Sequence, residues 1–431
     1  MACSREMLTV FRFHLLGLAH LPCSREYLSC AFSQKNHKLA RMMLSLGHEV
    51  LYYGAEGSDV PCTEFVQTHT LSDIRRDYGD GDNRFEIGYD FTNADFRHDF
   101  NSARKPSTVK YYAASITAIN ERKRDDDFLL CTQGSYQTPI ADAVKLFLTC
   151  EPGVGYRGSV EGRWRAFESK YIQDFTYGSA HPFDCINGSY YDRVIPNYFD
   201  PDDIEYSAEK NDYYLFIGRM IKRKGILTAD LVCRHLGTKL IIAGQGAYVD
   251  RRGYLVPNED PDFELPPGTW EYIGYCPVEK RKLLMAHAIA TFAPTEYLEC
   301  FAGTHVESML SGTPAITTNF GVFPGTIPDG LNGVVGFRCN TLQDFVDAAR
   351  KARECDPAEV RRHAERFLME NIRWEFQKWF EDLYAVYESA RDPNVKGWHR
   401  LKTTPGRRLD NLPAPDVESR EGVAAAPLAR Q

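Results

Sequence analysis

Residues 294–314 read PTEYLECFAGTHVESMLSGTP, and this stretch decides the fold class of the chain. The apolar run at 288–292 just before it predicts a buried strand, and a helix follows that ends at a Gly-Thr-Pro sequence. Glu299 therefore lies on a strand-to-helix loop, and Glu307 on the opening turns of the helix. Open α/β sheets bind ligands at such loops, and helix N-termini favour anions. The stretch predicts a site in which two glutamates hold hydroxyl groups beside a bound phosphate.

A second informative stretch lies upstream, where the apolar run 213–217 predicts another buried strand. Gly218 and Arg219 follow this run directly, and Lys224 comes shortly after them. A basic pair behind a buried strand is suited to neutralise a diphosphate, because guanidinium and ammonium groups both bind phosphate oxygens. The alternative is an ordinary helix start with a solvated basic face. A third strand is predicted at 239–246, which reads KLIIAGQG.

Together these stretches resemble the signatures of one enzyme family. Glu299 and Glu307 match an E-x7-E motif, the basic stretch matches G-R-x4-K-G, and 239–246 is similar to L-x-I-x-G-x-G. The DGLNG sequence at 329–333 is similar to a further turn of that family. The family is that of the retaining, nucleotide-sugar-dependent glycosyltransferases of family 4, also called glycosyltransferases group 1. The resemblance implies the α/β GT-B fold, in which two Rossmann-like domains face each other across a cleft and a C-terminal helix crosses back to the N-terminal domain.

The resemblance also sets the expected domain boundaries. Residues 1–205 are expected to form an N-terminal Rossmann-like, acceptor-binding domain, which ends near VIPNYFDPDD at 194–203. Residues 206–372 are expected to form the domain that binds the nucleotide sugar. The segment 373–390 has one strongly apolar face and is expected to be the crossing helix. The segment 391–431 is rich in Pro, Gly, Arg and Ala and is expected to be a disordered tail.

The family resemblance implies a donor site in the second domain. Arg219 and Lys224 would stabilise the departing diphosphate, while Glu299 would bind sugar hydroxyls. Glu307 would bind the ribose hydroxyls, because a carboxylate can accept two hydrogen bonds from a diol. The nucleobase would lie near 274–278, after another predicted strand. The donor-binding residues that the resemblance implies are Gly218, Arg219, Lys224, Gly274, Val278, Glu299, Phe301, Ala302, Gly303, Thr304 and Glu307.

The first domain departs from the family pattern at two loops. Relatives carry a His-Asp pair where this chain has TCEPGVGYRG at 149–158, so Glu151 is a candidate to position the donor sugar or the acceptor, or else to cap the following turn. The first loop lacks the common Gly-Gly sequence, and its His20 is a candidate phosphate or acceptor contact, or else an ordinary loop histidine. A helix predicted at 163–177 carries Phe167, Glu168 and Tyr171, and this acid-aromatic helix is expected to face the acceptor cleft. The predicted catalytic residues are Arg219, Lys224, Glu299, Glu151 and His20.

The composition of the chain limits the classes of function that fit this sequence. The chain has 431 residues, 43% of them hydrophobic, which is enough to bury two cores. Its net charge of −8 argues against nucleic-acid or membrane binding driven by overall charge. The 12 cysteines are scattered without zinc spacing and predict a reduced, cytoplasmic protein. The apolar runs are shorter than the roughly 18 residues of a membrane span. The resemblance implies neither a metal nor another cofactor.

These observations predict a hexosyl or related sugar transferase. The enzyme would move a sugar from a UDP-, GDP- or other nucleoside-diphosphate sugar to a hydroxyl acceptor, with retention of configuration and without metal. The acceptor would be a glycan, a lipid-linked sugar or a small molecule. Three alternatives stay open at this point: a transferase for hydroxymethylated bases in DNA, a GT-B epimerase or phosphorylase, and a non-catalytic sugar-nucleotide binder.

Overall fold

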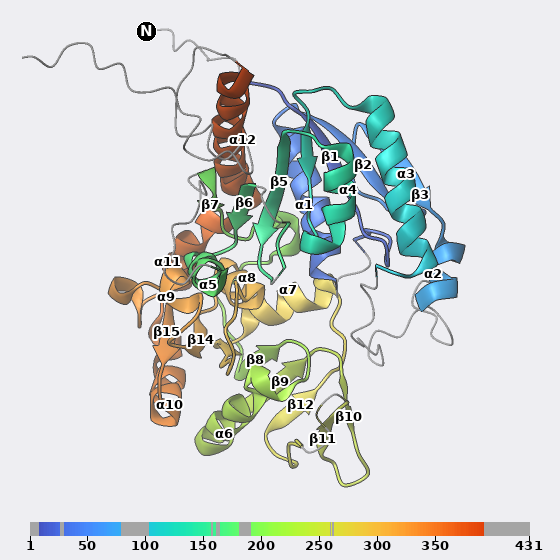
Figure 1. Cartoon of the computed structure of the whole chain (residues 1–431). Helices are drawn as coiled ribbons and strands as arrows, with labels where there is room; N and C mark the ends of the chain where they lie inside the picture. The colour runs from blue at the N-terminus through green and yellow to red at the C-terminus, as the bar shows by residue number, and fades with distance from the viewer. Residues whose placement is uncertain are drawn as a thin grey trace, which may run out of the picture.

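The computed structural model describes residues 8–25, 30–78, 103–156, 158–160, 164–180, 191–258, 260 and 263–391. Its strands form two parallel sheets and one antiparallel hairpin, which pairs β10 (Ala247–Val249) with β11 (Leu255–Pro257). The two sheets belong to two separate halves of the molecule, one above the other in Figure 1. This architecture confirms the predicted α/β fold with two Rossmann-like domains.

The first sheet has the strand order β3-β2-β1-β4-β5-β6-β7, and all its pairings are parallel. Its strands are β1 (Arg12–Leu16), β2 (Glu49–Ala55), β3 (Glu64–His69), β4 (Phe128–Leu130), β5 (Leu148–Val154), β6 (Trp164–Phe167) and β7 (Arg193–Val194). The helices of this half are α1 (Ala31–Ser45), α2 (Leu71–Tyr78), α3 (Pro106–Arg122), α4 (Thr138–Val144) and α5 (Lys170–Ala180).

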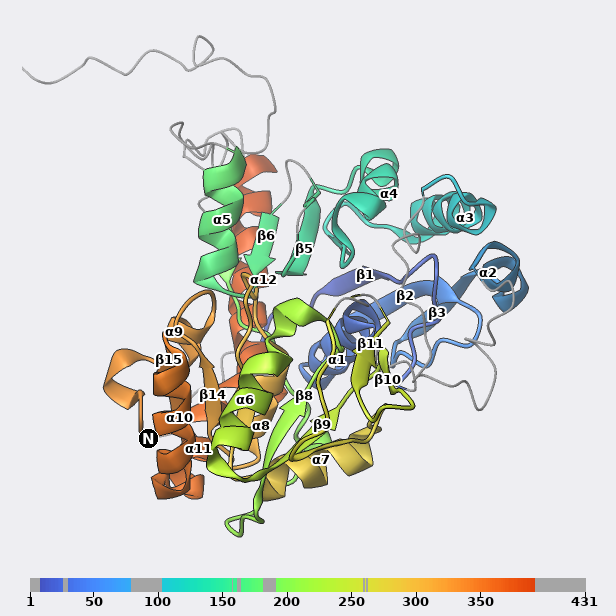
Figure 2. The same ribbon diagram turned by 90° about the horizontal axis from the view of Figure 1, so that it is seen from below.

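Both faces of the first sheet are covered because side chains alternate along each strand. On β1, Phe13 and Leu15 join a core with Met42 of α1, whereas Leu16 joins a second core with Tyr111 of α3 and Ile140 of α4. Figure 2 shows these helices on opposite sides of the sheet. A parallel sheet that is buried on both faces leaves the loops at its carboxyl edge as the natural place for ligands.

The second sheet has the order β12-β9-β8-β13-β14-β15, again with parallel pairings throughout. Its strands are β8 (Tyr213–Ile217), β9 (Lys239–Ala243), β12 (Trp270–Tyr272), β13 (Thr291–Ala293), β14 (Ala315–Thr318) and β15 (Gly336–Cys339). The helices of this half are α6 (Ile226–Leu236), α7 (Val278–His287), α8 (Gly303–Leu310), α9 (Phe323–Thr326), α10 (Leu342–Lys351) and α11 (Pro357–Ala364).

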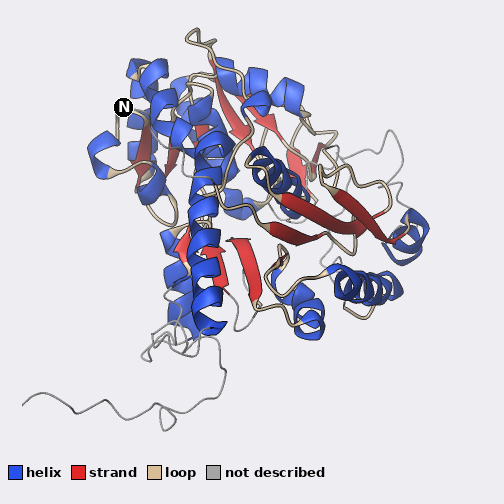
Figure 3. Cartoon of the chain, turned by 90° about the horizontal axis from the view of Figure 1, so that it is seen from above, coloured by secondary structure: helices blue, strands red, loops and turns tan. Residues whose placement is uncertain are grey.

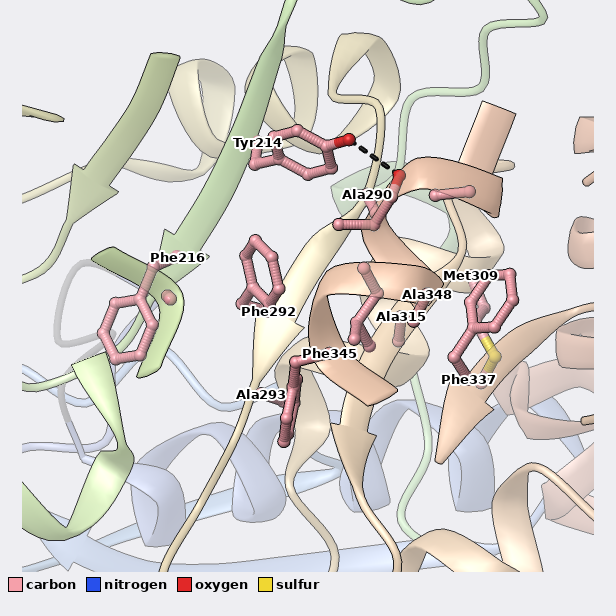
Figure 4. Close-up of a cluster of buried hydrophobic side chains, with 14 of the residues drawn as sticks. Tyr214, Phe216, Ala290, Phe292, Ala293, Met309, Ala315, Phe337, Phe345 and Ala348 are labelled. Atoms are coloured by element: carbon pink, nitrogen blue, oxygen red, sulfur yellow. Dashed lines mark hydrogen bonds between the residues drawn. The ribbon is translucent and has the colours of Figure 1, made fainter. Parts of the chain in front are cut away.

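Aromatic side chains from neighbouring strands fill the core of the second domain. Figure 4 shows Phe216 of β8, Phe292 of β13 and Phe337 of β15 in one buried cluster. Tyr214 also lies in this cluster, and its hydroxyl donates a 2.7 Å hydrogen bond to the backbone oxygen of Ala349. A buried tyrosine needs such a partner for its polar end, so the bond fixes α10 against β8.

The last helix, α12 (Met369–Arg391), returns to the first domain as predicted for the crossing helix. Phe376 and Phe380 are fully buried in the core of the first domain, and the ring of Phe380 lies 4.7 Å from that of Phe13. Figure 3 shows α12 as a long helix alongside the first sheet. The helix begins at Met369 and therefore includes residues before the predicted start at 373. Beyond Arg391, the predicted tail lies outside the described residues.

One prediction in the first domain is wrong. The segment 163–177 was expected to be one helix, but it contains the strand β6 and then the helix α5. Strand β6 pairs with both β5 and β7, so tertiary pairing overrides the helical pattern of the sequence. Glu168 therefore lies directly after strand β6, at the carboxyl edge of the sheet.

None of the helices in the described part of the chain combines the length and apolarity that a membrane crossing requires.

Candidate functional site

The two motif stretches of the second domain meet at the carboxyl ends of β8 and β13, which pair directly. Gly225 has a left-handed backbone, with φ +77°, and a Cβ atom at this position would collide with the backbone oxygen of Pro294. Only glycine therefore allows the loop after β8 to approach the loop after β13 so closely. The glycine of the G-R-x4-K-G motif thus brings its lysine to the first glutamate.

Lys224 and Glu299 form an ion pair at this meeting point. The hydroxyl of Tyr297 donates to the same oxygen, Glu299 Oε1, and the ammonium group of Lys224 lies 5.0 Å from the centre of the Tyr297 ring. Burial and the neighbouring carboxylate raise the pKa of Tyr297, so this tyrosine stays protonated and donates its hydrogen bond. The structure therefore brings together two of the predicted catalytic residues.

The loop after Glu299 turns sharply into α8. Ala302 adopts a left-handed backbone, with φ 58°, which residues other than glycine rarely do. His305 stabilises this turn, because its Nδ1 donates to the backbone oxygen of Ala302 and its Nε2 lies 2.8 Å from Thr326 Oγ1. Burial lowers the pKa of His305 to about 4, so its ring is neutral near pH 7. This histidine was not predicted from the sequence, because its role depends on contacts within the fold.

Glu307 lies on α8 and forms a 3.1 Å ion pair with Arg281 of α7. Lys38 of α1, in the first domain, also interacts electrostatically with Glu307: burial lowers the pKa of Lys38, and the charge of Glu307 opposes that shift. The predicted ribose-binding carboxylate thus pairs with one cation of its own domain and interacts with the charge of a second cation from the first domain. Neither cation was predicted from the sequence, because neither belongs to a motif of the resemblance.

The predicted nucleobase region also joins the site. The backbone nitrogen of Gly244, in the turn after β9, donates a 2.7 Å hydrogen bond to the oxygen of Gly274. A Cβ atom on Gly244 would collide with the oxygen of Gly218, so the turns that follow β8, β9 and β12 pack together. Val278 is the first residue of α7 and is half-buried. Among the predicted donor-binding residues, Phe301 has its side chain buried in the hydrophobic core of the second domain.

The two candidates of the first domain have different surroundings. Glu151 is fully buried on β5, where its oxygens accept 2.9 Å hydrogen bonds from the Tyr156 hydroxyl and the backbone nitrogen of Val160. Burial raises the pKa of Glu151 to about 7. These contacts are those of a carboxylate that caps its own loop. His20 is buried after β1, and burial, aided by His69, lowers its pKa to about 4.

A further ion pair in the first domain joins Lys35 of α1 to Glu168, which follows β6, and it lies near the loop after β13. The hydroxyl of Ser169 donates a 2.6 Å hydrogen bond to the backbone oxygen of Cys300, the residue that follows Glu299. Cys300 also packs against the first-domain cluster of Val154, Phe167 and Ile172. The segment that carries Glu168 was predicted to face the acceptor cleft, but no sequence pattern paired this acid with Lys35.

Residues 201–367 match the family model described as glycosyl transferases group 1. The matched segment contains both motif stretches, the Lys224–Glu299 pair and Glu307. A comparison with curated proteins gave no match.

Solved structures of glycosyltransferases share the fold of most of this chain. AviGT4, a glycosyltransferase involved in avilamycin A biosynthesis, is 18% identical with a TM-score of 0.57, over 87% of this chain and 98% of AviGT4. Sucrose-phosphate synthase from Thermosynechococcus elongatus is 14% identical with a TM-score of 0.58, over 87% and 99%. HepE from Anabaena, in complex with UDP-glucose, is 13% identical with a TM-score of 0.55, over 86% and 99%. The second domain is therefore one half of a GT-B fold.

Proposed function

We propose that this protein transfers a hexosyl or related sugar from a nucleoside-diphosphate sugar to a hydroxyl acceptor, with retention and without a metal. The observation that carries the proposal is the Lys224–Glu299 ion pair at the joined ends of β8 and β13. The pair places a cation for a diphosphate beside a carboxylate for sugar hydroxyls. HepE was solved in complex with UDP-glucose, which supports a donor of this class for the shared fold.

In this proposal, binding of the donor separates the two side chains of the ion pair. Its diphosphate draws Lys224 away from Glu299, and Glu299 then accepts hydrogen bonds from the sugar hydroxyls. Lys224 and Arg219 stabilise the negative charge that grows on the β-phosphate as the glycosidic bond breaks. These cations supply the counter-charge that a metal ion would otherwise supply. Glu307 exchanges its contact with Arg281 for the ribose hydroxyls in the same way.

The transfer step forms one bond and breaks one bond at the anomeric carbon. The acceptor oxygen bonds to this carbon from the face that the phosphate leaves, so the configuration is retained. The bond from the carbon to the β-phosphate oxygen breaks, its electron pair stays on the phosphate, and the phosphate takes the acceptor proton. Glu151 has both carboxylate oxygens occupied by its own loop, so this step assigns it no role as a nucleophile.

A thermal-shift panel of nucleoside diphosphates and their sugars tests the donor site. A ligand that binds only the folded protein raises its melting temperature. We expect a rise for one nucleotide family, and we expect Lys224→Ala and Glu307→Ala to lose it. Lys222→Ala is the matched control, because Lys222 lies in the same turn as Lys224 but is exposed. A folded wild type that responds to none of the nucleotides would contradict the proposal.

Release of the nucleoside diphosphate then tests turnover. With the donor that the panel selects, we expect slow hydrolysis without acceptor and faster release with a suitable hydroxyl compound. Interconversion of sugar nucleotides without acceptor, or dependence on orthophosphate, would instead indicate an epimerase or a phosphorylase. Binding without any turnover would indicate a sugar-nucleotide binder.

A further inference from the structure

Glu168 stands where an α/β sheet usually binds ligands. It follows Phe167, the last residue of β6, and its backbone nitrogen donates a 3.1 Å hydrogen bond to Val154, the last residue of β5. The two strands are parallel, so Glu168 lies at their common carboxyl edge. Glu151 lies within β5 and is fully buried, whereas the side chain of Glu168 keeps 7% of its surface exposed. Glu168 is therefore the better placed of these two acids to contact a substrate.

Several contacts fix the position of the Glu168 carboxylate. Lys35 pairs with it and also donates a 2.8 Å hydrogen bond to the backbone oxygen of Gly153. A Cβ atom on Gly155 would collide with Glu168 Oε2, so the glycine leaves the space that the carboxylate occupies. The loop that replaces the family's His-Asp pair thus surrounds an ion pair that two other elements supply.

The ion pair is also joined to the donor loop of the second domain. Ser169, the neighbour of Glu168, donates its hydroxyl hydrogen to the backbone oxygen of Cys300 at 2.6 Å. Cys300 follows Glu299, and burial together with the charges of Glu168 and Glu299 raises the pKa of its thiol to about 11, while Lys35 and Lys224 oppose the shift. All four charged groups therefore act on the thiol of one residue, which follows Glu299 in the chain and accepts the Ser169 hydrogen bond through its backbone oxygen.

We propose that Glu168, oriented by Lys35, binds the hydroxyl groups of a polyhydroxylated acceptor that lies over Cys300 beside the donor sugar. This inference rests on the proposed transferase function and names its acceptor class. Hydroxyl groups donate to a carboxylate and accept from an ammonium group, so the hydroxyl groups of a sugar can form hydrogen bonds with both partners of the pair. An apolar lipid chain at the same place would leave the remaining hydrogen-bonding sites of this pair unsatisfied.

Aromatic rings beside the pair fit a sugar acceptor as well. The ammonium group of Lys35 lies 5.8 Å from the centre of the Phe32 ring and 5.6 Å from that of Tyr156. These two rings are 5.4 Å apart. An apolar ring face next to paired charges is a surface that can meet both the C–H and the O–H groups of a carbohydrate.

The test compares transfer with hydrolysis in the full chain. With the donor selected by the thermal-shift panel, methyl glycosides of glucose, galactose, mannose and N-acetylglucosamine serve as acceptor probes. Vesicles that contain undecaprenyl phosphate serve as the lipid probe. For Glu168→Gln we expect transfer to the best glycoside to fall about tenfold or more, through a higher acceptor KM, because a hydrogen bond to a charged group is lost. Donor hydrolysis and the donor-induced thermal shift should change by less than about twofold.

Two more variants keep the test decisive. Glu168→Asp keeps the charge but withdraws it, and we expect an intermediate loss of transfer with normal hydrolysis. Asp174→Asn is the matched control, because Asp174 is an exposed acid on α5 that pairs with Lys170, and we expect no change in either rate. Unchanged transfer in Glu168→Gln would overturn the inference, and so would equal losses of transfer and hydrolysis or transfer to the lipid probe alone. A wild type without donor binding or hydrolysis would instead overturn the proposed function itself.

Discussion

Each domain holds one lysine–glutamate ion pair near Cys300, and the two pairs differ in how much of their side chains is exposed. In the second domain, Lys224 keeps 27% of its side-chain surface exposed and Glu299 keeps 10%. In the first domain, the side chains of Lys35 and Glu168 are only 10% and 7% exposed. Lys35 also bonds to a backbone oxygen, and the space for Glu168 depends on a glycine.

This difference separates a pair that can change partners from a pair that stays together. The side chain of Lys224 is partly exposed, so its ammonium group can turn to an incoming diphosphate, which carries more negative charge than one carboxylate. Lys35 and Glu168 are too enclosed to exchange partners at low cost, because a buried charge that loses its partner is strongly destabilising. The Lys224–Glu299 pair is thus suited to bind a leaving group, and the Lys35–Glu168 pair to present a fixed surface to an acceptor.

The largest effect is expected from a substitution that breaks the Lys224–Glu299 pair. Lys224→Ala removes a cation that faces the charge developing on the β-phosphate, so we expect kcat to fall by about 10² to 10³. Initial rates of nucleoside diphosphate release at saturating donor measure this loss. Lys222→Ala serves as the control, and equal rates for Lys224→Ala and Lys222→Ala would show that the donor pair has no part in turnover.

The next prediction concerns Glu151 of the first domain, which is buried and hydrogen-bonded within its own loop. Burial raises the pKa of Glu151 from 4.5 to about 7 in the folded protein. Between these values the folded protein keeps a proton that the unfolded chain has released, so the free energy of unfolding falls as pH rises. The fall for this group is on the order of 3 kcal/mol. Above the folded pKa the effect is complete.

Urea unfolding of wild type and Glu151→Gln at about pH 5 and about pH 8 measures this effect. We expect the wild type to lose more stability than the variant between the two pH values, because glutamine does not titrate. The same pH dependence in both proteins would show that Glu151 does not keep its proton in the folded state.

A smaller effect is expected at the second acid of the donor site. Glu307→Gln keeps the shape of the side chain but removes the charge that binds the ribose hydroxyls, so we expect the nucleotide Kd to rise by about 10- to 100-fold. Isothermal titration with the nucleoside diphosphate selected above measures it. Glu279→Gln is the control, because Glu279 is an exposed acid on α7 that pairs with Lys282. An unchanged Kd in Glu307→Gln would remove Glu307 from the donor site.

The smallest effect tests the link between the two pairs. Ser169→Ala removes the hydrogen bond to the backbone oxygen of Cys300, and we expect the free energy of unfolding to fall by about 1 kcal/mol. Urea unfolding measures this change, and the ratio of transfer to hydrolysis shows whether the link also aligns the two pairs. Wild-type values for both quantities would show that the domains are held in place without this contact.

Much of the second domain could be predicted from local sequence. The apolar runs of β8, β9 and β13 mark buried strands, and the residues after them carry the motif that places Lys224 and Glu299. Glycine at 225 is informative because its conformation and its close contact both exclude a side chain. The first domain was harder, because β6 reads as part of a helix until β5 and β7 pair with it.

Local sequence was enough to predict the α/β class and the loops that carry Lys224 and Glu299, because these follow from periodicity and from motifs of closely spaced residues. The crossing helix was an expectation that the family resemblance implied. The ion pairs and hydrogen bonds that join separate elements became known from the tertiary structure alone. Lys35 meets Glu168, Arg281 meets Glu307, and Ser169 meets Cys300 through contacts between separate elements of the chain. An ion pair or hydrogen bond between distant segments depends on strand order and helix packing, and spacing along the sequence does not record either one.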